Sequence, residues 1–265
     1  MESFTLQFQL FTLIFARIFA TLSFAPVLGS QTVNYFHRVA ITVLIALIVV
    51  PVAARPDILI NQLQENYFLL ILEQVFIGFL IGFSLTLLFA AFQLAGEFFS
   101  VQMGFGISEV FDPMSQISLP LMGTLKNLLA LYVFFISDSH LWLIKAVVYS
   151  YETLPTFQDN FLMQGGLHAG ILKFLSLLGS GMFLIALKLA LPVMGTLLLV
   201  SIVLGMLSKA APQMNILMLG FPMKIFIGLL ILGWSSPFII ELTFLQFELF
   251  FSHMHDMLTA WSKAG

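Results

Sequence analysis

Long apolar runs are the feature that most constrains how this 265-residue chain can fold. A helix needs about 20 mainly apolar residues to cross the roughly 30 Å core of a bilayer, because it rises about 1.5 Å per residue. The run at 193–204 is apolar at consecutive positions, whereas strands of a membrane barrel alternate apolar and polar residues. We therefore predict an all-α, polytopic helical membrane protein with about six apolar segments. These segments cover residues 4–28, 39–54, 67–92, 119–136, 171–204 and 216–240, the last continuing to 251. A short apolar stretch at 141–149 follows the fourth segment after a polar break.

The connections between these runs are mostly short, and none is long enough for a separate soluble domain. Residues 1–265 are therefore expected to form a single integral membrane domain. The run at 4–28 lacks the basic head and short apolar stretch of a cleavable signal peptide, so it is interpreted as a retained helix. The run at 171–204 is too long for one straight crossing, and we expect residues 179–181 or Pro192 to bend or divide it.

Composition excludes several classes of protein. Only 9% of the residues are charged, against about 25% in soluble domains, so water is not the main solvent of this chain. High hydrophobicity with a net charge of −3 argues against disorder, and the ten basic residues are scattered, which argues against a nucleic-acid-binding surface. Cysteine is absent, which excludes thiolate chemistry and disulfides.

The sequence offers no catalytic or metal-binding constellation, so we expect the protein not to be an enzyme and to need no cofactor. It contains no Walker phosphate loop. Asp138, Ser139 and His140 are triad residue types, but neighbours in sequence do not converge as a triad must. His253 and His255 are two residues apart, and such positions diverge on a helix.

Six charged residues interrupt the apolar segments. Each would cost roughly 2.5–3.5 kcal/mol at a lipid-facing helix centre. A single lysine is expected to reach the headgroups, but six charges together indicate shelter from lipid. Five are basic and one is acidic, so partners on other subunits, and hence a multi-subunit assembly, are a hypothesis. The six are Arg17, Glu73, Lys126, Lys173, Lys188 and Lys224.

The same charges allow an alternative function. Glu73 with Lys188 or Lys173 would suit the relay or substrate site of a small-solute secondary transporter. Such a transporter is expected to show two similar halves, and the sequence shows no internal repeat.

Two patterns indicate how the helices pack. Small residues recur every fourth position and allow close helix contact, either within this chain or between subunits: Gly78, Gly82, Thr86 and Ala90. Prolines recur through the C-terminal runs and predict kinked helices: Pro192, Pro212, Pro222 and Pro237.

The segment 93–118 is expected not to form a continuous helix, because glycines permit unusual φ values and Asp112 precedes Pro113. It is nevertheless rich in Phe, Ile, Val and Met. Irregular backbone at membrane depth is tolerated where protein buries it or where it lines a cavity, so this segment is either a pore plug or a plain interfacial loop; composition alone favours the loop. Met103, Met114 and Met122 flank it, either as an adaptable seal or as packed core.

Several motifs, in order along nearly the whole chain, resemble the FliR/SctT family of type III secretion export-gate subunits. They are Gln102-Met103-Gly104, Asp112-Pro113, Ser139-His140-Leu141-Trp142-Leu143, Leu191-Pro192, Leu204 to Lys209, Ala211-Pro212-Gln213-Met214-Asn215 and Gly220-Phe221-Pro222. Asp138 stands where that family often has Asn or Gly, and Lys209 where Arg is common; both keep a polar or basic character.

The resemblance implies a helical multi-subunit export gate with kinked helices, in which one such chain joins several copies of FliP and FliQ, with FlhB associated. It also implies a place in the bacterial inner (cytoplasmic) membrane, at the flagellar basal body, and passage of unfolded flagellar proteins, with much of the complex above the bilayer plane. The family's plug loop maps onto Gly104, Phe105, Gly106, Ile107, Val110, Phe111, Asp112, Pro113 and Met114, of which Phe105, Ile107, Val110 and Phe111 are expected to occlude the channel. Subunit packing is expected to involve Lys209, Pro212, Gln213, Asn215, Gly220, Phe221 and Pro222.

Overall fold

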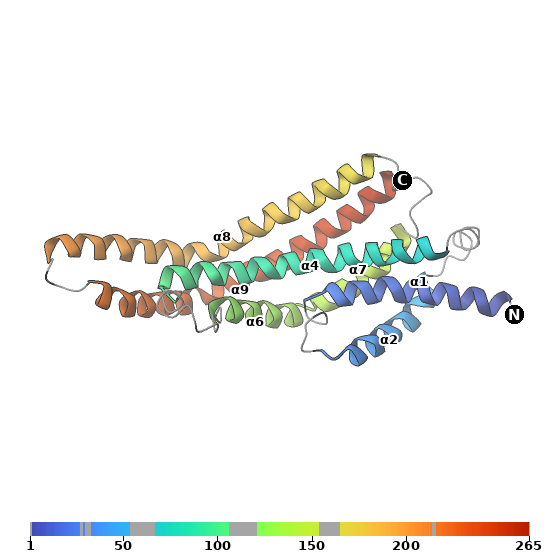
Figure 1. Ribbon diagram of the computed structural model, residues 1–265, viewed down its shortest axis with the longest axis horizontal. Helices are drawn as coiled ribbons and strands as arrows, with labels where there is room; N and C mark the ends of the chain where they lie inside the picture. The colour runs from blue at the N-terminus through green and yellow to red at the C-terminus, as the bar shows by residue number, and fades with distance from the viewer. Residues whose placement is uncertain are drawn as a thin grey trace. The chain divides into compact units, whose positions relative to one another are not determined.

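A computed structural model describes residues 2–26, 29, 33–53, 67–105, 121–153, 165–211, 213 and 216–264 of the chain. These residues form seven helices and no strand, which confirms the all-α prediction (Figure 1). The helices are α1 (Glu2–Phe24), α2 (Tyr35–Ala53), α4 (Tyr67–Met103), α6 (Leu121–Ile136), α7 (Ser139–Thr153), α8 (Gly165–Ala210) and α9 (Ile216–Ala264).

Four of these helices are long and apolar enough to cross a membrane, or five if α6 and α7 form one broken span. The polytopic prediction is therefore confirmed. The apolar spans are Gln7–Phe24, Tyr67–Met103, Phe174–Ala210 and Met218–Thr259, and Tyr35–Pro51 is a shorter apolar helix.

Helix α4 is longer than the sequence predicts. It was expected to end at residue 92, but it continues to Met103, so the first part of the segment 93–118 is helical. Gly96 lies within this helical part and is buried against α6, where a larger side chain would not fit.

Helices α8 and α9 are also continuous. Neither residues 179–181 nor Pro192 divides α8, and α9 continues through Pro222 and Pro237. A glycine inside a helix costs only about 1 kcal/mol relative to alanine, which is too little to interrupt a helix of this length.

The chain forms two compact units. The first comprises Met1–Leu88, Asp138–Gly179 and Glu248–Gly265, and the second comprises Phe89–Ser137 and Ser180–Phe247. In the first unit, α1, α2 and α7 pack against one another.

The small residues of α4 in the first unit pack within this chain. A Cβ added at Gly78 would collide with the Arg17 carbonyl, and one at Gly82 would lie 2.9 Å from the Cβ of Phe24. Thr86 Oγ1 donates a hydrogen bond to the Phe24 carbonyl. The stripe therefore brings the backbones of α1 and α4 together, which is the intrachain alternative.

An aromatic cluster joins α4, α6 and α9 in the second unit. Phe247 lies 5.4–5.8 Å, centroid to centroid, from Phe89, Phe92 and Phe134. Beside it, α4 and α6 approach so closely that a Cβ at Gly96 would lie 2.5 Å from the Cα of Gly123. This unit therefore depends on both aromatic packing and direct backbone contact.

Candidate functional site

Arg17 is a charged residue of the apolar helix α1, and it has no exposed surface. Its Nε donates to Gln74 Oε1 of α4 at 2.8 Å, and its NH1 donates to Ser150 Oγ of α7 at 2.8 Å. The guanidinium carbon lies 4.0 Å from the ring centroid of Tyr151, a cation–π contact. One side chain therefore connects three helices.

An acidic residue of the same chain lies near the positive charge of Arg17. Glu73 of α4 is close enough to interact with it electrostatically. The hydroxyl of Tyr151 donates to the Ile14 carbonyl at 3.0 Å, which fixes the ring under the guanidinium. Arg17 therefore has an acidic neighbour in its own chain, which is compatible with the five-to-one excess of basic residues among the six intramembrane charges. Pairing of the other cations across subunits stays a prediction.

The sequence singled out Arg17 and Glu73, but it missed Gln74, Ser150 and Tyr151. Gln74 is a polar residue in the middle of an apolar run, which is the signal that would have marked it. Ser150 and Tyr151 carry no comparable signal, because hydroxyl residues at a helix end are common.

A Schellman motif ends α4 at the start of the expected plug. Gly104 has a φ of 88°, and its N–H donates to the Val101 carbonyl at 3.2 Å. The Phe105 N–H donates to the Ser100 carbonyl at 3.0 Å. These two bonds satisfy carbonyls that a helix end leaves unpaired, and the left-handed conformation favours glycine. Gly104 therefore has a φ that other residues rarely adopt, as expected, while its place in a plug stays a prediction.

The side chains around this motif belong to a hydrophobic core. Met103 and Met122 are buried together with Phe99, and Phe105 packs against the same cluster. The two methionines are therefore packed core residues, as one of the two alternatives predicts. The side chain of Phe105 attaches the residue that follows Gly104 to the same core. The other expected plug residues lie outside the described part of the chain: Gly106, Ile107, Val110, Phe111, Asp112, Pro113 and Met114.

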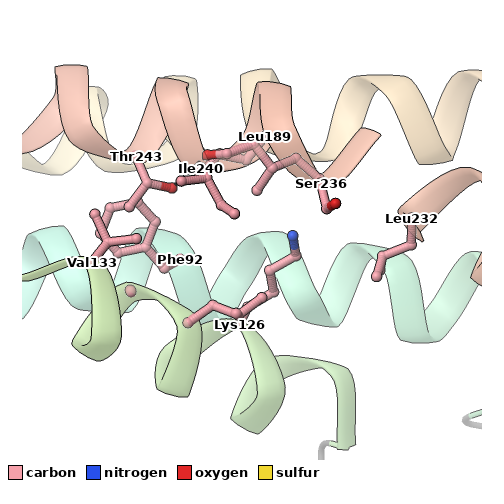
Figure 2. Close-up of a pocket in the computed structure, with 11 residues that line it drawn as sticks. Phe92, Lys126, Val133, Leu189, Leu232, Ser236, Ile240 and Thr243 are labelled. Atoms are coloured by element: carbon pink, nitrogen blue, oxygen red, sulfur yellow. Dashed lines mark hydrogen bonds between the residues drawn. The ribbon is translucent and has the colours of Figure 1, made fainter. Parts of the chain in front are cut away.

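Lys126 of α6 is a second buried cation, with 4% of its surface exposed. Its Nζ lies 5.0 Å from the ring centroid of Phe99 and points into a pocket of about 60 Å³ beside α9 (Figure 2). Apolar side chains line most of this pocket, and the polar lining residues other than Lys126 are Ser236 and Thr243. The sequence did not indicate either hydroxyl.

The remaining expected residues differ in exposure. Lys188, Lys209 and Gln213 are exposed, while Lys224 is half-buried. Gly220 is buried, with Leu204 Cδ1 3.4 Å from where its Cβ would lie. Phe221 is half-buried and Pro222 is exposed. Pro212, Asn215 and the side chain of Lys173 lie outside what the structure describes.

The polar residues considered for chemistry are dispersed. Among the described residues, no three His, Asp or Glu side chains are placed to hold a metal ion. His255 stacks on Tyr149, with ring centroids 4.4 Å apart. Asp138 has a φ of 53° and its carbonyl accepts from Leu141 N at 2.9 Å, so it forms the turn that starts α7.

Comparison with known proteins identifies the family. A profile of bacterial export proteins, family 1, matches residues 8–249. The flagellar biosynthetic protein FliR of Pectobacterium carotovorum subsp. carotovorum is 33% identical over 94% of this chain and 93% of its own length. The chain belongs to the FliR family. The FliR of Escherichia coli strain K12 is 30% identical over 92% of this chain and 90% of its own. The surface presentation of antigens protein SpaR of Shigella flexneri is 29% identical over 83% and 82%.

Membership of the FliR family assigns the chain to flagellar biosynthesis and protein export. Together with its membrane-spanning helices, it makes the chain a membrane-embedded component of the flagellar export apparatus.

Proposed function

We propose that this chain is a subunit of the flagellar type III export gate in the bacterial inner membrane, where it forms the channel for unfolded flagellar proteins together with FliP and FliQ homologues. FlhB homologues associate with this complex, and the segment that begins at Gly104 plugs the closed channel. The proposal extends the family assignment by naming the assembly and the role of this chain within it.

The length of the apolar helices is the observation that carries the proposal. The apolar span of α8 has 37 residues, about 55 Å, and that of α9 has 42 residues, about 63 Å. A bilayer core is about 30 Å thick, and a 40° tilt would use only about 40 Å of helix. The excess apolar length needs a cover other than lipid tails, and neighbouring protein subunits provide one.

The exposed surface of these helices supports the same conclusion. Only 28% of the most apolar window of α8 and 11% of that of α9 lie buried. Large apolar side chains on both helices are well exposed: Leu191, Leu199, Met206, Phe226 and Trp234. Contiguous apolar surface of this kind marks an interaction surface, in lipid or against other chains.

The proposed plug rests on the family resemblance and on the way the segment begins. The Schellman motif at Gly104 ends α4, and the side chain of Phe105, the next residue, packs against the hydrophobic core. An apolar constriction stops ions by dewetting, so the apolar residues of the segment suit a closed state.

Purification tests the assembly. The chain, expressed with its FliP and FliQ homologues and extracted in mild detergent, is expected to elute as one large complex containing all three proteins. A monomer or dimer that lacks both partners would contradict the proposal and would suit a carrier instead.

Ion leakage tests the plug. Deletion of residues 106–111 keeps the cap and Phe105, and it is expected to raise ion leakage across membranes that contain the assembled complex. A same-length Gly/Ser replacement of these residues is the matched variant, and it is also expected to leak because it removes the apolar side chains. Unchanged conductance in both variants, at normal complex yield, would exclude the plug.

A further inference from the structure

Lys126 presents a charged group to a partly enclosed space inside the second unit. Its Nζ makes a cation–π contact with the ring of Phe99. Figure 2 shows the side chain extending from α6, with its Nζ directed toward Ser236 of α9. A buried ammonium is costly unless its charge is opposed and its donors are used.

Among the residues that line the pocket, Lys126 supplies a hydrogen-bond donor and none carries a negative charge. Ser236 Oγ donates to the Gly233 carbonyl at 2.8 Å, and Thr243 Oγ1 donates to the Ile239 carbonyl at 2.7 Å. Both hydroxyl protons are therefore used within α9, and the two hydroxyl oxygens can act only as neutral acceptors toward the ammonium. An anionic acceptor would supply the opposing charge that these oxygens lack.

The dimensions of the site restrict the anion. The pocket of about 60 Å³ has room for one carboxylate group but not for the chain of a lipid.

A carboxylate carried by a protein fits these conditions best. The methylene groups of an Asp or Glu side chain can pack on the apolar wall of the pocket. A folded partner holds that side chain in place, which lowers the entropy cost of binding. The neighbouring surface of α9 is apolar and exposed, with Trp234 among the most exposed side chains, so an approaching helix has a surface to pack on.

We propose that the Lys126 pocket receives the carboxylate of an Asp or Glu side chain from a second polypeptide of the export assembly, which pairs with the Lys126 ammonium. This inference rests on the proposed function, because it needs an assembled partner.

Zero-length crosslinking of the purified wild-type complex tests the pairing. A membrane-permeant carbodiimide adds to a carboxyl group to give an O-acylisourea, and an amine in contact with it then forms an amide while the substituted urea leaves. Mass spectrometry is expected to find Lys126 joined to an Asp or Glu of another chain. Amides only to Glu97 or Glu241 of this chain, or no amide at Lys126 in the intact complex, would overturn the inference. Because the complex must first be isolated, its absence would instead count against the proposed function.

Substitutions provide a second measurement. Lys126→Met keeps the apolar stem but removes the charge, and it is expected to lower complex yield at least about tenfold by leaving the partner's carboxylate unpaired. Lys126→Arg is expected to retain more of the yield than Lys126→Met. The matched control is Lys145→Met, since Lys145 also makes a cation–π contact, 4.7 Å from the Trp142 ring, but is exposed. Equal yields for Lys126→Met and Lys145→Met would overturn the pairing.

Discussion

At the scale of single residues, Arg17 shows how a charged side chain is accommodated in an apolar helix. A guanidinium has five donors in a planar fork, and two of them reach Gln74 and Ser150 on different helices. Its flat face lies on Tyr151, and Glu73 opposes its charge. A lysine has no such fork or flat face, so arginine is specifically required by this geometry.

Replacing Arg17 is therefore expected to destabilise the first unit. Arg17→Met leaves Gln74 and Ser150 without their charged partner, and we expect a loss of about 2–4 kcal/mol. Arg17→Lys keeps the charge but not the fork, and its loss is expected to be about half as large. The measurement is the thermal unfolding midpoint of the purified chain in detergent. Lys145→Met is the control on an exposed cation, and a loss no larger than in this control would show that the cluster contributes little.

The sequence predicts part of this cluster but not its composition. The cost of burying charge is a local property, so Arg17 and Glu73 stand out in the apolar runs. Their neighbours depend on which helices meet, and Gln74 and Ser150 lie 57 and 133 residues from Arg17 along the chain. No periodicity in one sequence indicates contacts at such separations.

At the scale of helices, glycine has different effects according to its backbone and its neighbours. Gly104 has the positive φ that the sequence predicts to be possible there, and it follows the last residue of α4, a helix end that the sequence placed at residue 92. Residues 179–181 do not divide α8, and Gly96 lies in α4 although it belongs to the segment 93–118 that was expected not to be a continuous helix. Composition does not distinguish these cases, and helix packing alone does not either: Gly96 packs against α6 while Gly179 and Gly181 have no atom within 4 Å, yet all three are helical.

The end of α4 is expected to be sensitive to the residue at position 104. Gly104→Ala places a Cβ on a left-handed backbone, which costs about 1–2 kcal/mol. The control is Gly195→Ala in α8, where no atom lies within 4 Å of the added Cβ. That control is expected to be neutral or to stabilise by up to about 1 kcal/mol. Chemical denaturation in detergent compares the two, and equal effects would contradict the role of the Schellman motif.

The contact between α4 and α6 gives a separate prediction. Gly96→Ala would place a Cβ 2.6 Å from the backbone nitrogen of Gly123, so the helices must separate. We expect a loss of about 1–3 kcal/mol, as in other overpacked cores. The same denaturation measurement applies, with Gly205→Ala as a control in open space. An unchanged midpoint for Gly96→Ala would show that this close approach is not required for stability.

At the scale of the whole molecule, the sequence predicts the fold class and the class of environment but not the assembly. Hydropathy and run length identify membrane-spanning helices without knowledge of any contact, which explains why the all-α prediction is confirmed. The same runs underestimate the helices, because α4, α8 and α9 continue through polar and proline positions that tertiary packing tolerates. What surrounds each exposed face is a property of the assembly and is absent from a single chain.

The chain contains no cysteine, so single cysteines introduced into α8 can show directly which positions are shielded from water. Single cysteines at every fourth position of Phe174–Ala210, including Leu187, Leu191 and Leu199, can be treated in membranes with an impermeant thiol reagent. A bilayer core protects about 20 residues of a span that has 37, so positions outside it are expected to react when FliP and FliQ homologues are absent. Those same positions are expected to become protected when both partners are present, because protein then covers the excess apolar length. Labelling after denaturation confirms that each cysteine is reactive, and a pattern that does not depend on the partners would show that lipid and this chain alone cover the helix.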